Sequence, residues 1–580
     1  MVERAAKRSY GKAHAWHKQG INILHLQGTL SEMAAQHGAL LRHQIHQGAV
    51  PYLGTKNDLL MTHSHLFRNR PRLQAAARKF IRWFIDKPML SQIPRIYSDE
   101  MRAFAKAAHL PVDLCEKSVL QADSLVLLLR YFMGRYLLRQ TAGGFPGCTS
   151  VVALNNTTKN KKLIHARNMD YPVVGRWDSF PSIFYFDPEG VDRGQRYIGI
   201  SSAGVHTAGV TGINESGLTL TAHFHCAKAV SPFGVPIQII GSEVIRKART
   251  IGQAVDIVND LNRAGTWSLV VSSAKENNAV VIEMIHGRIS VREPKDGKLA
   301  HTNHFHTPEF QQREIMLSTS VAKDYAERYK RAMDLLTKNE GSVDRGTLAQ
   351  ILADHYDRET QKIRGHGNTI SVITTVTSII SEATEGRFWM SNATESPTCL
   401  GDYAAFKIDE DFKNYDQQEP ELFRWSAEGS GSIRDTVKHG ALRHFRRAYI
   451  AYHTEYDLAE AAKHSEVAAQ TDAEEGHYHL AHGHFRMRLG QVERAFEAFR
   501  KAQTCSMSPH MTQVSKLFFA HAYDCLGKRQ EALELYRQIR NAVDPQVRRE
   551  AARCIRRPFK VDRTWNITFD LQFCDCFEYA

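Results

Sequence analysis

The chain has 580 residues, of which 43% are hydrophobic and 24% are charged. This composition is ordinary for a globular protein and excludes a disordered chain, and the length predicts two to four domains at roughly 150 residues per domain. The formal net charge is +13, but the basic residues are spread along the sequence, which argues against a nucleic-acid partner.

The cysteines and the chain start indicate the compartment. Nine cysteines are scattered without any Cys-x-x-Cys pair, so neither a zinc site nor a disulfide framework is indicated. No apolar segment follows the charged N-terminus, so no secretory signal is expected. The most apolar helical stretch, 118–138, contains Asp123 and Arg130, which is typical of a buried helix and not of a membrane span. We therefore expect a cytoplasmic protein without a membrane partner.

The first part of the chain, 1–147, is predicted to be a mainly helical segment that packs on the core and is a candidate propeptide. Residues 1–20 form a basic, loosely ordered lead, and Ile21–Leu26 alternates as one strand. Thr29 or Ser31 then caps the first helix, and a helical pattern interrupted by prolines follows.

The sequence pattern of residues 148–412 predicts a sheet-rich core with helices outside it. One helix is expected over 235–261, and further helices over 318–338 and 346–356. Strands are expected at 149–154, 162–167, 182–186, 197–200, 206–213, 218–224, 268–273, 279–285, 288–292, 369–380 and 386–392. This order favours two antiparallel layers covered by helices, an α+β class of fold.

The C-terminal part is predicted to be all-α and repetitive. Residues 413–435 contain the polar and glycine-rich segments of a linker, and 436–580 follow as a helical domain. Within that domain, Leu489-Gly490-x4-Ala495-x3-Phe499 recurs 37 residues later as Leu526-Gly527-x4-Ala532-x3-Tyr536. Small residues let paired helices approach closely, so the pattern resembles a short tetratricopeptide-like array that offers a protein partner a surface. An ordinary helical bundle is the alternative.

Cys148 is the residue with the strongest claim to chemistry. It follows Gly147 at the head of a β-branched run, whereas a lone cytosolic cysteine is usually a small buried hydrophobic residue. Arg167 would favour a thiolate, and Asp170 could orient an amine or a proton donor. Because they are three residues apart, they project to opposite faces of a strand unless a turn or bulge aims both at one site.

Several segments together resemble one known family. Gly147-Cys148-Thr149-Ser150 and Ala166-Arg167-Asn168-Met169-Asp170-Tyr171 are similar to motifs of the acyl-coenzyme A:6-aminopenicillanic acid acyltransferase family of N-terminal-nucleophile (Ntn) cysteine hydrolases. Leu26–Leu41, Gly212–Leu218 and Thr302-Asn303-His304-Phe305 resemble further family segments in the same order. The resemblance covers roughly residues 20–412.

The resemblance implies an αββα Ntn-hydrolase sandwich that cleaves itself between Gly147 and Cys148. The freed α-amine of Cys148 would then serve as base for its own thiol, with Asp170 bonded to that amine and Arg167 beside the thiolate. Asn303 would present its side-chain N–H to the oxyanion, and no cofactor or metal is implied. The cluster of His301, His304 and His306 lacks a completing ligand at metal spacing.

The residues have structural interpretations as well. Arg167 and Asp170 could form an ion pair or cap a turn, and Asn303 could brace a loop. Candidate substrate-binding residues are Trp177, Phe224 and Arg328, the last of which resembles a downstream family arginine.

The functional hypothesis is a self-processing cysteine amidohydrolase that acts on a C–N amide bond of a small N-acyl or peptide-like compound through an acyl-thioester on Cys148. One alternative is an acyltransferase that passes the acyl group to an amine. Another is an inactive Ntn domain that acts as a scaffold through its helical repeats.

Overall fold

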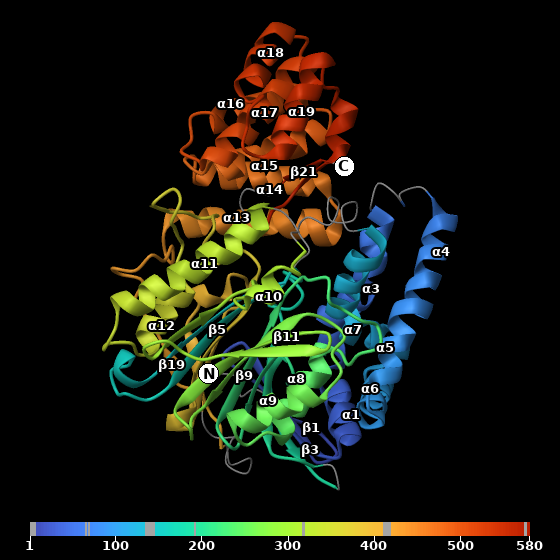
Figure 1. Ribbon diagram of the computed structural model, residues 1–580, viewed down its shortest axis with the longest axis vertical. Coiled ribbons are helices and arrows are strands. Elements are labelled where there is room, and N and C mark those ends of the chain that lie inside the picture. Colours follow the sequence, from blue (N-terminus) through green and yellow to red (C-terminus); the bar gives the residue numbers. More distant parts are fainter. Residues whose placement is uncertain are drawn as a thin grey trace.

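The computed structural model describes residues 7–63, 67, 70–133, 146–190, 193–315, 319–409, 419–572 and 577–579. These residues form two large sheets and many helices (Figure 1), which confirms a mixed α+β protein. Among the described helices, none combines the length and the apolar character that crossing a membrane requires.

The larger sheet has the strand order β1-β2-β3-β6-β7-β8-β9-β10-β11-β12 in the described residues. Its neighbours are antiparallel except β3 and β6, which run parallel. The strands are β1 (Arg8–Tyr10), β2 (Ala13–Lys18), β3 (Ile21–Gly28), β6 (Pro181–Pro188), β7 (Tyr197–Ser202), β8 (Thr211–Asn214), β9 (Leu218–Phe224), β10 (Trp267–Ser273), β11 (Asn278–Ile285) and β12 (Arg288–Arg292).

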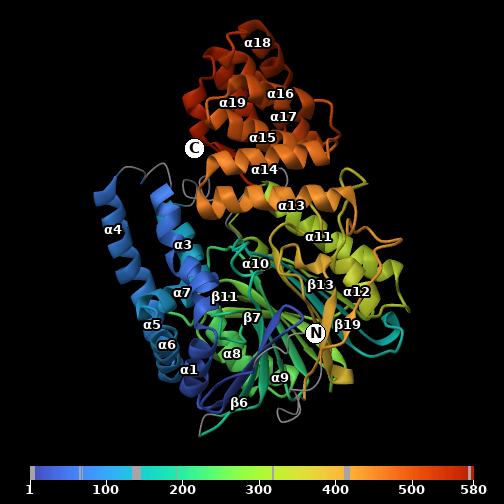
Figure 2. The same ribbon diagram turned by 180° about the vertical axis from the view of Figure 1, so that it is seen from behind.

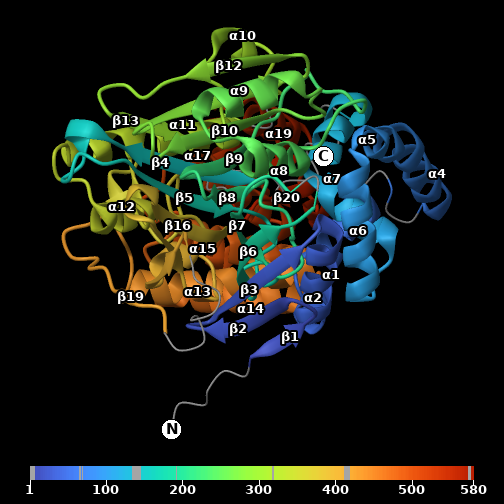
Figure 3. The ribbon, with the colours of Figure 1, turned by 90° about the horizontal axis from the view of Figure 1, so that it is seen from below.

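The start of the chain differs from its prediction as a loose lead with one strand after it. Residues 8–28 form β1, β2 and β3, which lie at one edge of the larger sheet beside β6 (Figure 3). Gly11 and Gly20 make the connecting turns with left-handed φ angles of 58° and 80°. The ring of Trp16 is buried in an apolar cluster between the sheets, which explains why this basic stretch is ordered.

The second sheet has the order β13-β4-β5-β16-β17-β18-β19. Its strands are β4 (Gly147–Ala153), β5 (Ile164–Asp170), β13 (Lys298–His301), β16 (Thr375–Glu382), β17 (Arg387–Ser391), β18 (Tyr403–Lys407) and β19 (Leu422–Phe423). All neighbours are antiparallel, and β16 carries a bulge between Thr375 and Thr377 where it pairs with β5. The candidate nucleophile, Cys148, is therefore the second residue of a strand that has a neighbour on both sides.

The two sheets lie face to face. Ile183 and Ile213 of the larger sheet pack against Ile379 and Phe388 of the smaller one. Helices cover the outer face of the larger sheet: α1 (Leu30–Leu40), α2 (Arg42–Gln47), α3 (Ala49–His63), α4 (Pro71–Ile81), η1 (Arg82–Asp86), α5 (Lys87–Gln92), α6 (Arg95–Ala108), α7 (Val112–Leu128), η2 (Leu129–Met133), α8 (Ile237–Lys247) and α9 (Ile251–Asp260). On the smaller sheet pack α11 (Thr319–Lys338) and α12 (Arg345–Leu352), while α10 (Pro308–Gln311) lies in a small satellite core.

Two helix starts can be compared with the predicted helices. Thr29 caps α1, and its hydroxyl and the Glu32 carboxylate form a reciprocal capping box. The single helix predicted over 235–261 is two helices, because the chain is extended at Ala248 and Thr250 caps a new helix.

The C-terminal helices stack away from the core in chain order (Figures 1 and 2). They are α13 (Val437–Ile450), α14 (Leu458–Thr471), α15 (Gly476–Arg488), α16 (Val492–Ala502), α17 (Pro509–Cys525), α18 (Arg529–Gln538) and α19 (Pro545–Arg556). The sequence repeat corresponds to two equivalent helix pairs, because Gly490 and Gly527 both end a helix with left-handed φ angles of 73° and 76°. Short strands β20 (Ile567–Phe569) and β21 (Phe577–Tyr579) follow.

The described part of the predicted linker, 419–435, packs on the core. Leu422 and Phe423 form β19 at the edge of the smaller sheet. Trp425 and Ile433 are buried, and the indole N–H of Trp425 donates to the carbonyl of Gly401. The segment therefore continues the sheet and leads directly into α13.

Candidate functional site around Cys148

The thiol of Cys148 lies between the two sheets. Cys148 is the second residue of β4, and its side chain points toward β9 of the larger sheet, where it lies 3.6 Å from the carbonyl oxygen of Ala222. The guanidinium Nη2 of Arg167 donates to its Sγ at 3.1 Å. Only 3% of Cys148 is exposed, so the thiol is closed off from solvent in this structure.

Arg167 is held rigidly in place. Its Nη1 donates to the carbonyl of Val210 at 2.7 Å and to the hydroxyl of Thr211, and Nη2 also donates to the carbonyl of Ala222 at 2.7 Å. Burial raises the pKa of the Cys148 thiol above its ordinary value, and the charge of Arg167 opposes this rise. The fixed cation thus favours the thiolate at a place where burial disfavours it.

Asp170 faces the other side of the smaller sheet. It lies opposite Gly147 in the register of β4 and β5, which is continuous, so no bulge in β5 brings Arg167 and Asp170 to one face. Both residues lie near Cys148 because β4 is the strand next to β5. Arg167 is on the same face as the thiol, whereas Asp170 lies beside Gly147, the residue that precedes Cys148. A Cβ added at Gly147 would lie 3.2 Å from Cβ and Oδ2 of Asp170.

The carboxyl of Asp170 is strongly perturbed. Its Oδ1 accepts a hydrogen bond from the hydroxyl of Thr375 at 2.7 Å, and its Oδ2 lies 3.8 Å from Nη1 of Arg328. Burial raises the pKa of Asp170 to about 6, against the opposing charge of Arg328 and the bond from Thr375. Among the described residues, Oδ2 has no hydrogen-bond partner, and it lies beside Gly147, so it is free to accept a hydrogen bond from a nearby backbone N–H or amine.

Arg328 is more central than its prediction as a substrate-binding residue. From α11, its Nη1 donates to the carbonyl oxygen of Cys148 and to the hydroxyl of Thr149, both at 2.8 Å. Its Nε donates to Asp324 at 2.8 Å, one helical turn earlier. The side chain is 1% exposed, so Arg328 fixes the backbone at Cys148 from inside the protein.

Asn303 lies beside Cys148, but its amide is turned opposite to the predicted orientation. Its Oδ1 accepts from the backbone N–H of Cys148 at 2.7 Å and from Nη2 of Arg328 at 3.2 Å. Because both of these groups are donors, the amide N–H must point the other way, and it donates to the carbonyl of Phe224 at 2.9 Å. In this structure the amide N–H therefore points away from Cys148, and its role toward an oxyanion stays a prediction.

The two aromatic candidates take structural positions. The indole N–H of Trp177 donates to the hydroxyl of Thr377 at 3.0 Å, and its ring lies 5.6 Å from that of Tyr171. Phe224 offers its carbonyl to Asn303, while its ring packs edge-on against Trp267 in the core beneath the helices. Neither ring makes a described contact with the thiol of Cys148.

Histidines near the site are buried and neutral. His223 exchanges a hydrogen bond of 2.8 Å with Ser150, and His225 contacts His301 at 3.3 Å. Burial lowers the pKa of His223, His225 and His301 well below the ordinary value. They therefore stay uncharged near neutral pH.

Among the described residues, one group has the spacing of metal ligands, and it lies in the C-terminal helices. His521, Glu550 and Cys554 place their ligand atoms within 4.8 Å of one another. Arg553 already pairs with Glu550 and lies 3.2 Å from Sγ of Cys554, so a cation occupies the place where a metal ion would add charge. This arrangement does not favour a metal.

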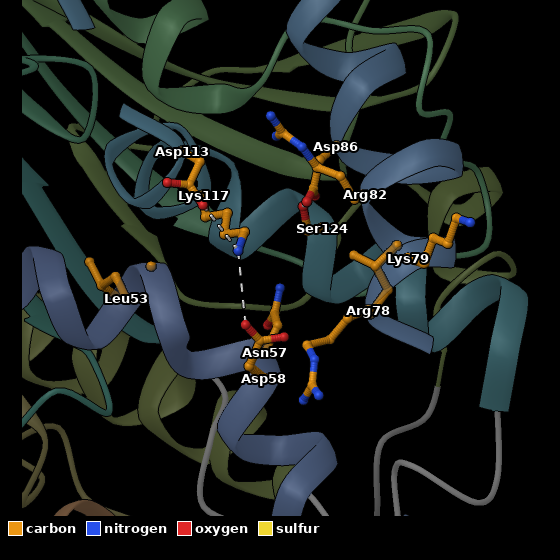
Figure 4. A pocket seen from close by; sticks show the side chains of 12 residues that line it. Leu53, Asn57, Asp58, Arg78, Lys79, Arg82, Asp86, Asp113, Lys117 and Ser124 are labelled. Atoms are coloured by element: carbon orange, nitrogen blue, oxygen red, sulfur yellow. Dashed lines mark hydrogen bonds and ion pairs between the residues drawn. The ribbon is translucent and has the colours of Figure 1, made fainter. Parts of the chain in front are cut away.

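A cavity of about 270 Å³ lies away from the predicted site, among α3, α4, η1 and α7 (Figure 4). Its lining mixes cations with carboxylates, and none of the predicted site residues lines it. The lining residues are Leu53, Gly54, Asn57, Asp58, Arg78, Lys79, Ile81, Arg82, Asp86, Asp113, Lys117 and Ser124.

Two residues of the site were not predicted. Asp324 holds Arg328, and the spacing of four residues between opposite charges on one helix could have indicated the pair. Thr375 reaches Asp170 at the bulge in β16, for which the sequence gives no signal.

The fold and the group around Cys148 define an α+β protein with a buried thiol held beside a guanidinium. Residues 156–396 match the model of the acyl-coenzyme A:6-aminopenicillanic acid acyl-transferase family. The match covers less than half of the chain; it confirms the resemblance recognised in the sequence, and that family is one of acyltransferase- or hydrolase-type enzymes. The matched segment contains Arg167, Asp170, Asn303 and Arg328, and Cys148 precedes it. No curated protein matches the chain.

Proposed function

We propose that the protein is a self-processing Ntn cysteine amidohydrolase with an αββα catalytic core. The observation that supports this best is the arrangement at one residue. Arg167 contacts the thiol of Cys148, Asn303 accepts its backbone N–H, and Arg328 donates to its carbonyl. A structural cysteine requires no such control of both its side chain and its backbone.

The first reaction is cleavage of the bond between Gly147 and Cys148. Sγ attacks the carbonyl carbon of Gly147, the C–N bond breaks, and the thiol proton passes to the leaving nitrogen. The resulting thioester is hydrolysed by water, which leaves a carboxylate on Gly147 and returns the thiol to Cys148. Arg167 stabilises the thiolate, and the absence of a side chain at Gly147 leaves the space in which the carbonyl can tilt.

Cleavage creates the base for turnover. The new α-amine of Cys148 has an ordinary pKa near 8 and can take the thiol proton directly or through water. Asp170 Oδ2 and Asn303 Oδ1 are the acceptors that hold this amine. The substrate amide then acylates Sγ, its amine leaves, and water releases the acid. Transfer of the acyl group to an acceptor amine is the alternative outcome.

The C-terminal helices form a tetratricopeptide-like module in this proposal. The two equivalent helix pairs, with buried Ala495 and Phe499 in one and Ala532 and Tyr536 in the other, support it. A catalytically inactive protein that recruits a partner through this module is the competing function.

A denaturing gel with N-terminal sequencing tests the proposal. We expect two fragments, the longer one beginning at Cys148, and covalent labelling of that fragment by a thiol-directed acylating probe. Cys148→Ala should remain one chain and take up no label, whereas the control Cys554→Ala, which removes another buried cysteine, should cleave normally. An intact wild-type chain that also fails to react with the probe would refute the enzyme and favour the scaffold. Mass-spectrometric screening of acyl amides would then define the substrate.

A further inference from the structure

Helix α4 forms an outer edge of the molecule, beyond α3 and α7 (Figures 1 and 2), and the short π-helix η1 continues it. Of the described side chains of α4, only that of Ile81 is buried. On the inner side, the cavity of about 270 Å³ in Figure 4 separates the helix from α3 and α7. The core therefore covers little of the apolar surface of α4.

An apolar stripe runs along this helix and into the short π-helix η1 that follows it. Leu73, Phe80 and Phe84 are spaced by seven and four residues, which places them on one side of a helical segment. Leu73 is 39% exposed, Phe84 is 61% exposed, and the neighbouring Trp83 is 54% exposed. The rings of Phe80 and Phe84 stack with centroids 4.5 Å apart. Such a cluster of exposed aromatic and aliphatic side chains marks an interaction surface.

A row of cations flanks the stripe. Arg72 and Lys79 have the same spacing of seven residues as Leu73 and Phe80, one position earlier, so the two rows run alongside each other. Residues 71–85 contain no Asp or Glu. Arg72 and Lys79 are both exposed, although Lys79 also lines the rim of the cavity, and the ammonium of Lys87 lies 3.2 Å above the ring of Trp83.

We propose that α4 and η1 dock on the surface of an anionic phospholipid bilayer, with the helix axis in the plane of the interface. A helical segment in which a row of Lys and Arg runs beside a stripe of Leu and Phe fits this environment, because its apolar side chains enter the headgroup boundary while its cations meet lipid phosphates. Nucleic acid would use the cations alone and leave Leu73 and Phe84 exposed. The proposal departs from the expectation that the chain has no membrane partner, and it is independent of the reaction at Cys148.

Vesicle co-sedimentation of the full chain tests this surface. We expect binding to phosphatidylcholine vesicles that contain phosphatidylserine, weak binding to phosphatidylcholine alone, and release by salt. Each cation near such a surface contributes roughly fivefold to binding, so Arg72→Glu together with Lys79→Glu should reduce it by more than tenfold. Phe84→Glu should reduce it by roughly tenfold through lost apolar burial. Brominated lipid should quench Trp83, and this quenching should be absent from Trp83→Phe.

The control is Val543→Glu, which places the same charge at an apolar side chain that is 85% exposed in the loop between α18 and α19. It should leave vesicle binding unchanged. Three results would overturn the proposal: no binding to phosphatidylserine vesicles, equal loss in Val543→Glu, or loss with the charge variants but not with Phe84→Glu, which would indicate a soluble polyanion. A dimer in solution that Phe84→Glu dissociates would show that a second copy covers the stripe instead. Circular dichroism of each variant establishes that α4 remains folded.

Discussion

Replacement of Arg328 by Met removes the cation that faces both the backbone of Cys148 and the carboxyl of Asp170. The guanidinium makes two hydrogen bonds of 2.8 Å at the nucleophile and pairs with Asp324 at 2.8 Å, all in the interior. Loss of one charge-assisted hydrogen bond costs about 1.5–3 kcal/mol, which corresponds to a roughly 10- to 150-fold slower cleavage. The substitution also leaves a buried carboxylate without its partner, which should lower the free energy of unfolding by roughly 3–5 kcal/mol.

The pH profile of cleavage gives the sharper readout. The pKa of Asp170 is about 6, so its carboxylate form becomes populated as pH rises through that value. If the carboxylate is the working form, cleavage of the wild type rises through pH 6. Arg328 is the strongest influence that opposes the effect of burial, so its removal raises this pKa. An opposite charge at this range is worth about 1–3 pKa units, and the acid limb in Arg328→Met should move up by that amount.

The matched control is Arg331→Met, one turn further along α11. Arg331 makes a bidentate pair with buried Asp354 at 2.9 and 2.7 Å, but it does not contact Cys148. We expect a comparable loss of thermal stability in both variants and a shifted acid limb in Arg328→Met alone. An unshifted limb in Arg328→Met, or the same shift in Arg331→Met, would show that Arg328 does not control Asp170. Quantified fragments from timed gels across pH provide the measurement.

Two further substitutions test the close packing around the site and its contact with the C-terminal helices. Gly147→Ala should slow cleavage markedly at a stability cost on the order of 1–3 kcal/mol, because the new Cβ lies 3.2 Å from two atoms of Asp170; cleavage at the wild-type rate would contradict the assigned scissile bond. Arg446→Met should lower stability by roughly 3–5 kcal/mol in thermal unfolding, because it leaves Asp178 buried without its cation at 2.8 Å. The exposed Arg443→Met on the same helix should cost about 0–1 kcal/mol, and equal losses would refute a special role for the buried pair.

Local motifs were sufficient to find the residues around Cys148. Cys148, Arg167, Asp170 and Asn303 lie in segments whose residue types and order resemble the family, and the structure brings all four together. Their exact orientation depends on the tertiary structure. The amide of Asn303 is turned by two donors, one of which comes from Arg328 on a separate helix. No property of the tetrapeptide around Asn303 indicates that contact.

The sheet order was less accessible from sequence than the strands themselves. Alternation identified most strands after residue 148, but it could not show that β3 pairs in parallel with β6, which follows more than 150 residues later. Residues 8–18 were missed because their basic side chains hide the burial of Ala13, Ala15 and Trp16. The order of this stretch depends on a partner sheet that only the folded chain supplies.

The first of the C-terminal helices, α13, packs against the α+β part of the chain. Asp178, shortly after β5, accepts from the backbone N–H of Gly175 at 2.7 Å and from Arg446 of α13 at 2.8 Å. Gly175 has a φ of 79°, and a Cβ there would lie 2.9 Å from Ile450 of α13. The first helix of the array thus closes over the loop that begins directly after Asp170. Since removing α13 would leave Asp178 buried without a counter-charge, α13 stabilises the loop that follows Asp170.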